Sequence, residues 1–145
     1  MLEPLREAVK RGAQVVCFNP LKERGLERFQ HPQNALEMLT NGSSPLNTAF
    51  FRPALGGDMA AIRGIAKFLL AWEREAQAEG SEPVFDHAFI AEHTDGLEAY
   101  LAELDATPWE HLERQSGLGL AEIEQAARMY RRANRVIVCW AMGIT

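Results

Sequence analysis

Three short apolar runs most constrain the fold of this chain. They lie at residues 13–18, 48–51 and 135–140. An irregular connection separates the first run from the second, and segments with helical periodicity separate the second from the third. Each run is nearly continuous rather than alternating, which is typical of strands buried on both faces of a parallel sheet. Parallel strands need crossover connections, which are usually helical and pack on the sheet faces. We therefore predict an α/β fold: a three-layer Rossmann-like domain with a small, mostly parallel sheet and helices on both faces.

The helical segments have clear start and stop signals. The longest one follows Asp58, and apolar residues at helical spacing line one face of it. These residues are Met59, Ile62, Ile65, Ala66, Leu69 and Trp72. Further helices are predicted at residues 2–11, 86–92, 97–104 and 121–132, and a shorter one begins at Thr107-Pro108 and ends near Gly117.

Composition bounds the class of protein. The 145 residues are about one domain's worth, so residues 1–145 are predicted to form a single α/β domain. The formal net charge of -5 counts against a sequence-independent nucleic-acid binder, because such binding relies on Lys and Arg. The sequence shows neither an apolar run of transmembrane length nor a signal-peptide pattern. We therefore expect a cytoplasmic protein that binds neither nucleic acid nor membrane.

The side chains that usually carry chemistry are scattered. Cys17 and Cys139 each lie inside an apolar run, so we predict buried, free thiols without a metal. The four histidines occur singly, without the spacing of metal ligands. No Ser/His/Asp or Cys/His arrangement has a spacing that indicates a nucleophile. We therefore expect this chain to contribute no catalytic residue and no metal ligand.

A glycine corner, Arg52-Pro53-Ala54-Leu55-Gly56-Gly57-Asp58, joins the second apolar run to the longest helix. Glycines at such a turn let the backbone bend and let another molecule approach closely. Asp58 would repel a phosphate, but its carboxylate suits a group with two adjacent donors, such as the N1–H and N2–H₂ edge of guanine. The alternative is structural: Asp58 caps the helix and the glycines only form the turn.

Two further segments are candidate binding elements. Asn19-Pro20 follows the first apolar run, and the carboxyl ends of parallel strands are where such sheets place ligand contacts. The alternative for Asn19 is a turn-forming residue before Pro. Residues 21–47 form a long connection with basic residues near its start, which suits either phosphate contacts or a solvated loop.

The last apolar run is followed only by Ala141-Met142-Gly143-Ile144-Thr145, without a covering helix. We therefore expect the chain to be an internal fragment whose partner is the remainder of its own parent chain. The sequence leaves the oligomeric state open.

Five motifs occur in an order that resembles the interior of a molybdopterin oxidoreductase large subunit, of the formate-dehydrogenase-like, YdeP-type group. The motifs are residues 12–20, Arg52-Pro53 with Gly56-Gly57-Asp58, residues 86–90 with Thr94-Asp95-Gly96 and Tyr100, residues 126–130, and residues 140–145. The resemblance covers nearly the whole chain.

The resemblance implies a molybdenum or tungsten ion held by two molybdopterin guanine dinucleotides, and places this chain in a dinucleotide-binding α/β domain. By position, Asn19 and Pro20 would lie beside the nucleotide, Gly57 and Asp58 at the guanine, and Met142 and Gly143 near the pterin. The metal ligand and the active-site residues would lie elsewhere in the parent.

Two functions follow. The first is a molybdopterin guanine dinucleotide binding segment of a molybdenum-dependent oxidoreductase, which alone would neither catalyse a reaction nor retain the cofactor. The alternative is a non-enzymatic α/β or helical interaction module, for which the helix pair at residues 117–132 has a helix-turn-helix character. The acidic balance of the chain counts against DNA as the partner of such a module.

Overall fold

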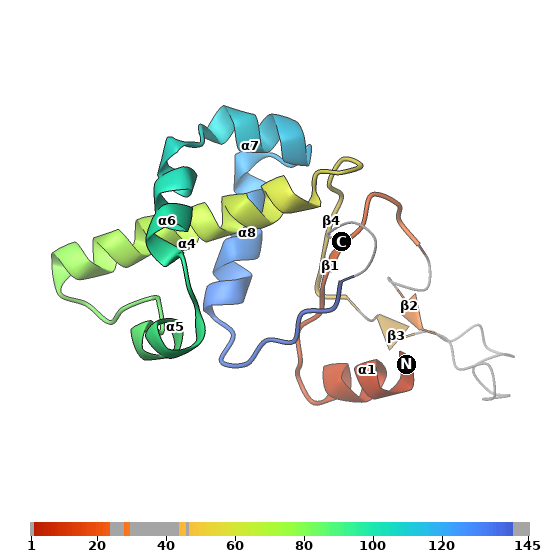
Figure 1. The fold of residues 1–145 in the computed structure, drawn as a ribbon. Coiled ribbons are helices and arrows are strands. Elements are labelled where there is room, and N and C mark those ends of the chain that lie inside the picture. The colour runs from red at the N-terminus through yellow and green to blue at the C-terminus, as the bar shows by residue number, and fades with distance from the viewer. Residues whose placement is uncertain (1, 24–27, 30–43, 46, 141–145) are drawn as a thin grey trace, which may run out of the picture. The chain divides into compact units, whose positions relative to one another are not determined.

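The computed structural model describes residues 2–23, 28–29, 44–45 and 47–140. The chain divides into two compact units, Met1–Arg52 and Pro53–Thr145 (Figure 1). Among the described residues, no helix combines the length and the apolar character that crossing a membrane requires.

The first unit contains a small parallel sheet. Strand β1 (Val16–Phe18) pairs in parallel with β4 (Ala49–Phe51), with Val16 opposite Ala49 and Phe18 opposite Phe51. The rings of Phe18 and Phe51 stack with centroids 5.1 Å apart. Helix α1 (Leu2–Lys10) precedes β1, and β2 (Arg28–Phe29) pairs antiparallel with β3 (Ser44–Pro45). The first two predicted strands and their parallel pairing are therefore confirmed, and the chain is an α/β protein with a small parallel sheet.

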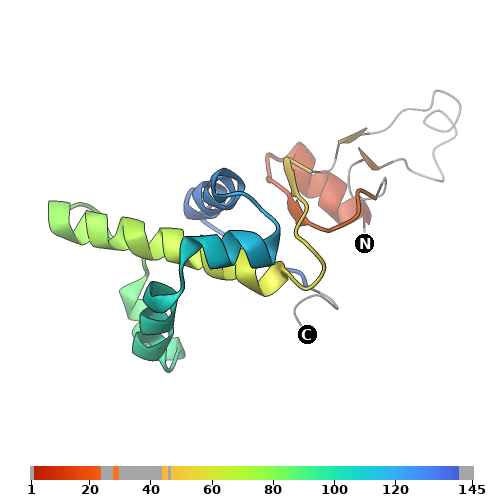
Figure 2. The same ribbon diagram turned by 90° about the horizontal axis from the view of Figure 1, so that it is seen from above.

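The second unit is helical. Its elements are α4 (Asp58–Glu79), α5 (His87–His93), α6 (Leu97–Ala106), α7 (Trp109–Ser116) and α8 (Leu120–Arg131). Figures 1 and 2 show α4 as the longest helix, with α8 on one side and α6 on the other. The predicted helices are confirmed to within a few residues at each end. The predicted stop at Gly117 is confirmed, because α7 ends there in the left-handed conformation with a φ of 71°. Helix α4 ends in the same way at Gly80, which has a φ of 68°.

The core of the second unit is built on the small residues of α4. Ala60, Ala61 and Gly64 are buried, and a Cβ added at Gly64 would lie 2.7 Å from Cγ2 of Ile123. The missing side chain therefore lets α8 approach α4 closely. This arrangement corrects the predicted inward face, because Met59 and Ile62 are 54% and 42% exposed. Burying the small residues against α7 and α8 turns those two side chains outward.

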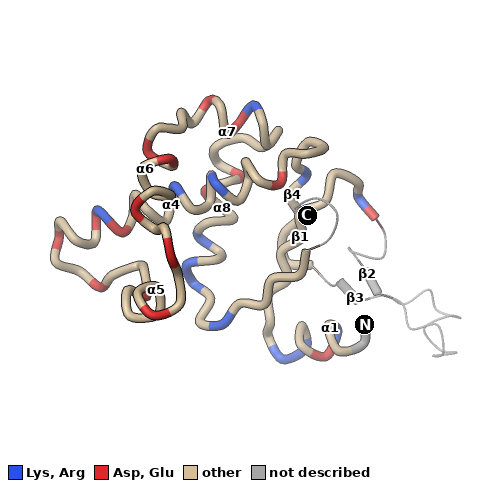
Figure 3. Tube along the Cα trace, in the orientation of Figure 1, with Lys and Arg blue, Asp and Glu red and all other residues tan. Residues whose placement is uncertain are grey.

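Cationic side chains make two kinds of contact in the second unit, one with backbone carbonyl groups and one with an aromatic ring. The ammonium of Lys67 donates to the carbonyl oxygens of Leu104 and Thr107 at 2.6 and 2.5 Å, at the carboxyl end of α6, where helices leave carbonyl groups without helical partners. The guanidinium groups of Arg128 and Arg131 lie 5.1 and 5.4 Å from the ring centroid of Trp72. Figure 3 shows basic residues along α8. Positive charge near the carboxyl end of a helix is stabilising, because it opposes the negative end of the helix dipole.

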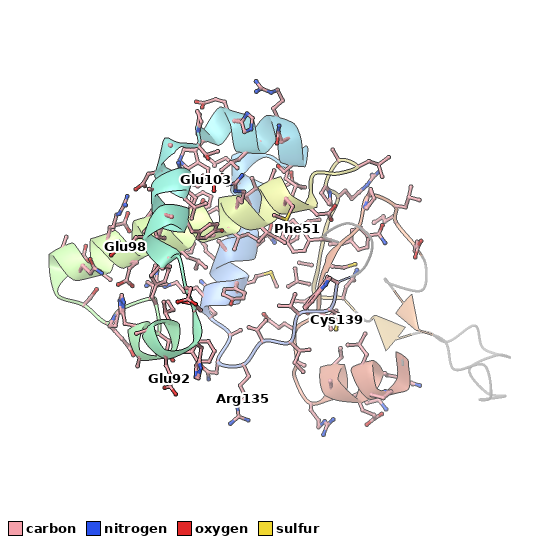
Figure 4. All side chains as sticks on the ribbon, in the orientation of Figure 1. Phe51, Glu92, Glu98, Glu103, Arg135 and Cys139 are labelled. Atoms are coloured by element: carbon pink, nitrogen blue, oxygen red, sulfur yellow. The ribbon has the colours of Figure 1, made fainter. Side chains whose placement is uncertain are left out.

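The third predicted strand is wrong for this chain. Residues 135–140 have no regular secondary structure, and Ile137 and Val138 are 91% and 59% exposed. Cys139, labelled in Figure 4, is exposed as well, which corrects its predicted burial. An apolar run becomes a strand only when another strand satisfies its backbone groups, and the described residues supply none here. Cys17 is half-buried, and both thiols are free as predicted.

The two thiols should react at different rates. Burial raises the pKa of the Cys17 thiol, and the charge of Glu23 raises it further, so less of the reactive thiolate is present. We expect a thiol reagent at neutral pH to label Cys139 at least about tenfold faster than Cys17 in the native chain. The Cys139→Ser variant should retain only the slow reaction. Equal rates at the two positions would contradict the structure.

Candidate functional site: the glycine corner before α4

The glycine corner forms a tight turn at the entrance of α4. The N–H of Gly57 donates to the carbonyl oxygen of Ala54 at 2.8 Å, and Gly56 has a φ of 79°. This left-handed conformation is unfavourable for residues that have a Cβ, so the sequence needs glycine here. Leu55, at the tip of the turn, is 89% exposed.

Gly57 is required for a different reason. Its backbone is in the right-handed helical region, with a φ of -86°, so conformation alone does not demand glycine. A Cβ at this position would instead lie 2.7 Å from the carbonyl oxygen of Gln115 and 2.8 Å from that of Ser116. Gly57 is therefore glycine because the backbone at the end of α7, in the same chain, lies close to it.

Asp58 is the first residue of α4, so its predicted position at the helix N-terminus is confirmed. It does not cap the helix, which corrects the sequence interpretation. The cap is Gly57, and no side chain makes a capping hydrogen bond. An N-cap side chain must lie outside the first helical turn, and the chain enters that turn one residue earlier than predicted. Asp58 lies instead in the first turn of α4, where the positive end of the helix dipole stabilises a negative charge.

The carboxylate of Asp58 is half-buried and unengaged. It makes no hydrogen bond or ion pair with any residue that the structure describes. Two adjacent acceptor oxygens are thus available, which is the donor-to-acceptor match that the edge of guanine requires. The residues at this corner therefore fit a guanine group, whereas a phosphate would meet the negative charge of the carboxylate.

Asn19 and Pro20 lie directly after β1, at the carboxyl edge of the sheet. The N–H of Asn19 donates to the carbonyl oxygen of Phe51 at 3.1 Å, so the ladder with β4 continues for one residue. Its side-chain oxygen accepts the N–H of Leu21 at 3.0 Å. The turn-forming interpretation of Asn19 is therefore correct for its side-chain oxygen. Its side-chain nitrogen, Nδ2, makes no hydrogen bond with the described residues.

The remaining predicted site residues are distributed as follows. Asn19 and Pro20 belong to the first unit, and Gly57 and Asp58 belong to the second. Met142 and Gly143 lie outside the described residues. Most of the basic connection between β1 and β4 lies outside them too. The contacts of these residues with a cofactor stay a prediction.

Glu73 on α4 is a charged residue that the sequence analysis missed. Its side chain is 3% exposed, and its carboxylate accepts hydrogen bonds from the N–H groups of Val84 and Phe85 at 2.6 and 3.0 Å. Gln77 Nε2 and His87 Nε2 lie 2.7 and 2.8 Å from the other oxygen. Burial alone would raise the pKa of Glu73, but these partners hold it at about 2.

The geometry gives Glu73 a structural role. A carboxylate with a pKa of about 2 is ionised at neutral pH, and its oxygens already accept four hydrogen bonds, so it is a poor proton acceptor. It ties α4 to the start of α5 instead. The spacing of Ala66, Leu69, Glu73 and Ala76 could have revealed this position, since it places Glu73 in the apolar repeat.

The whole chain is similar to part of several larger proteins. It is 43% identical over 145 residues to Protein YdeP of Escherichia coli (strain K12), which is 100% of this chain and 19% of that protein. It is 34% identical over 145 residues to Uncharacterized oxidoreductase Mb2924c of Mycobacterium bovis, 18% of whose length is covered. A stretch of 64 residues, 44% of this chain, is 39% identical to 9% of Formate dehydrogenase H of Escherichia coli.

The chain is related to oxidoreductases. It spans about a fifth of the length of YdeP. No family model matches it. These similarities confirm the formate-dehydrogenase-like part of the resemblance seen in the sequence. The described part of the chain has no group of three or more His, Cys, Asp and Glu side chains placed to hold a metal ion.

Substituting Gly57 tests the close approach at the corner. We expect Gly57→Ala to lower the free energy of unfolding by about 1–3 kcal/mol more than Gly119→Ala does, because its Cβ would overlap backbone atoms of α7. Gly119 is the matched control. It also caps a helix with negative φ, and the nearest atom to its added Cβ is 3.7 Å away. Equal losses in urea unfolding would show that the contact with α7 is not tight.

Glu73→Gln tests the buried carboxylate. We expect it to lower the free energy of unfolding by about 2–3 kcal/mol at pH 7, because charge-assisted hydrogen bonds are lost in a buried site. Exposed Glu75→Gln should change it by less than about 0.5 kcal/mol.

The effect should also depend on pH. Folding lowers the pKa of Glu73 from its ordinary value of 4.5 to about 2, so its contribution is complete above pH 4.5 and is lost as the pH falls towards 2. The difference between the wild type and Glu73→Gln in urea unfolding should therefore shrink over this range. A difference that stays constant would contradict the assignment.

Proposed function

We propose that this chain is the cofactor-holding segment of a molybdenum-dependent oxidoreductase that resembles formate dehydrogenase. In this proposal the complete protein binds molybdopterin guanine dinucleotide. The names of the relatives support oxidoreductase chemistry. The observation that carries the nucleotide assignment is the unengaged carboxylate of Asp58 at the entrance of α4.

Each residue has a defined role in this proposal. Asp58 accepts hydrogen bonds from guanine N1–H and N2–H₂, and Gly57 keeps the corner compact so that the base can reach it. Asn19 and Pro20 border the nucleotide at the carboxyl edge of the sheet. Met142 and Gly143 lie near the pterin. The bound cofactor supplies the redox chemistry, while this chain binds and orients it.

The complete protein would build a larger domain around this segment. Parallel sheets occur almost only with both faces covered, and a two-stranded sheet is too small for that. We therefore propose a three-layer Rossmann-like domain, to which the remainder of the parent chain adds strands and helices. The exposure of Ile137 and Val138 supports this, since large apolar patches mark contact surfaces. The partner is then the parent chain itself, in the cytoplasm, and the segment alone would not retain the cofactor.

The proposal predicts that Asp58→Asn lowers cofactor content. Asn keeps the size of the side chain, but it offers one acceptor where two are needed and adds a donor that faces a guanine donor. Charge-assisted hydrogen bonds contribute roughly 1.5–3 kcal/mol each, so occupancy should fall strongly. The measurement is guanine nucleotide released by acid from the purified full-length protein, expressed per mole of protein.

The matched control is Asp95→Asn, the same chemical change at an exposed position outside the corner. It should leave the nucleotide content unchanged. The melting temperature of Asp58→Asn should also stay close to that of the wild type, because Asp58 forms no capping hydrogen bond. Wild-type nucleotide content in Asp58→Asn would mean that this carboxylate does not read guanine.

A further inference from the structure

The loop that carries Asp58 is held by a second part of the chain, the junction between α7 and α8. The N–H of Ala54 donates to the carbonyl oxygen of Ser116 at 2.7 Å. The backbone of Gly57 lies against the carbonyl oxygens of Gln115 and Ser116. Figures 1 and 2 show the loop, in yellow, beside the carboxyl end of α7. Both ends of the turn are therefore in contact with one short stretch of backbone.

The junction itself is rigidly built. Ser116 and Leu118 are 0% and 2% exposed, and the hydroxyl of Ser116 accepts the N–H of Leu118 at 3.1 Å. Gly117 has a φ of 71°, and its N–H donates to the carbonyl oxygen of Glu113 at 2.9 Å. Gly117 itself is exposed, but the two residues that flank it are buried and hydrogen-bonded, and a turn held in this way has few alternative conformations. It can therefore fix whatever packs on it.

Gly117 is the point at which the junction touches the loop most closely. A Cβ at Gly117 would lie 2.9 Å from the Cβ of Ala54 and 3.0 Å from its nitrogen. A side chain here would push Ala54 away and weaken the hydrogen bond to Ser116. Because the N–H of Gly57 is bonded to the carbonyl of Ala54, the displacement would reach Asp58 through the turn.

We infer that Ser116 and Gly117 are positioning residues for the guanine site, although they lie about sixty residues after Asp58 in the sequence. This inference rests on the proposed function of Asp58. Neither residue touches the nucleotide. They set the position of the carboxylate by holding the turn that precedes α4, and a binding group must be held closely by its supporting residues to be effective.

The test compares Gly117→Ala with Gly80→Ala in the full-length protein. Both glycines end a helix in the left-handed conformation, so both substitutions introduce the same kind of backbone strain. Only Gly117 has neighbours, since an added Cβ at Gly80 meets nothing within 4 Å. Three quantities are measured: guanine nucleotide released by acid, hydrogen exchange of the peptide that contains Ala54, and the melting temperature.

We expect Gly117→Ala to reduce the nucleotide content to roughly a third or less and to speed exchange at Ala54 about tenfold. Gly80→Ala should lower the melting temperature but leave nucleotide content and exchange as in the wild type. Adding Ala54→Gly to Gly117→Ala removes the nearest overlapping atom, so it should restore part of the nucleotide content. This milder double variant also provides the comparison if Gly117→Ala alone fails to fold.

The outcomes distinguish a failure of this inference from a failure of the proposed function of Asp58. If Asp58→Asn loses nucleotide while Gly117→Ala keeps it, the junction does not position the site and the inference is wrong. If both glycine variants lose nucleotide in proportion to their melting temperatures, the role of Gly117 is general stability, and the inference is wrong again. If Asp58→Asn itself keeps the nucleotide, the proposed function fails and the inference fails with it.

Discussion

The close approach of α4 to α7 and α8 is the contact on which the second unit depends. Two glycines make it possible, because Gly57 lies against backbone carbonyls of α7 and Gly64 lies against the side chain of Ile123. Close-packed interiors have little free volume, so an added carbon at Gly57 requires the backbone to shift, and one at Gly64 requires the side chain of Ile123 to move. The same contact places the first residue of α4, and with it the carboxylate of Asp58, at a fixed end of the helix.

Two charged side chains of the second unit, buried Glu73 and partly buried Lys67, form hydrogen bonds with backbone groups near the ends of helices. Glu73 accepts the N–H groups that precede α5, and Lys67 donates to the carbonyl oxygens that end α6. A buried charge such as that of Glu73 is tolerated only when it is fully hydrogen-bonded, and Glu73 has four partners. Strong perturbation of a pKa often marks a catalytic centre, but structural networks produce it as well. Glu73 belongs to the second case, since its partners leave no oxygen for a substrate.

The candidate site differs from the common phosphate-binding corner of α/β proteins in one respect. Such corners offer free N–H groups and no negative charge, whereas this one begins its helix with Asp58. The electrostatics therefore select a donor-rich ligand over an anion. Fold alone does not determine chemistry, so the functional proposal relies on this carboxylate together with the similarity to oxidoreductases. In this proposal, the α7–α8 junction adds to the residues proposed to bind the ligand those that hold the binding loop in place.

The sequence by itself determined what depends on neighbouring residues. Helical periodicity predicted the helices, and Gly117 predicted the end of α7, because these signals act within a few residues. The tertiary structure decided the rest. Which face of α4 is buried, why Gly57 is glycine, and what Glu73 binds all depend on groups distant in sequence. The run at residues 135–140 has the composition of a buried strand, but no strand among the described residues pairs with it. Pairing is a property of two segments, whereas composition is a property of one.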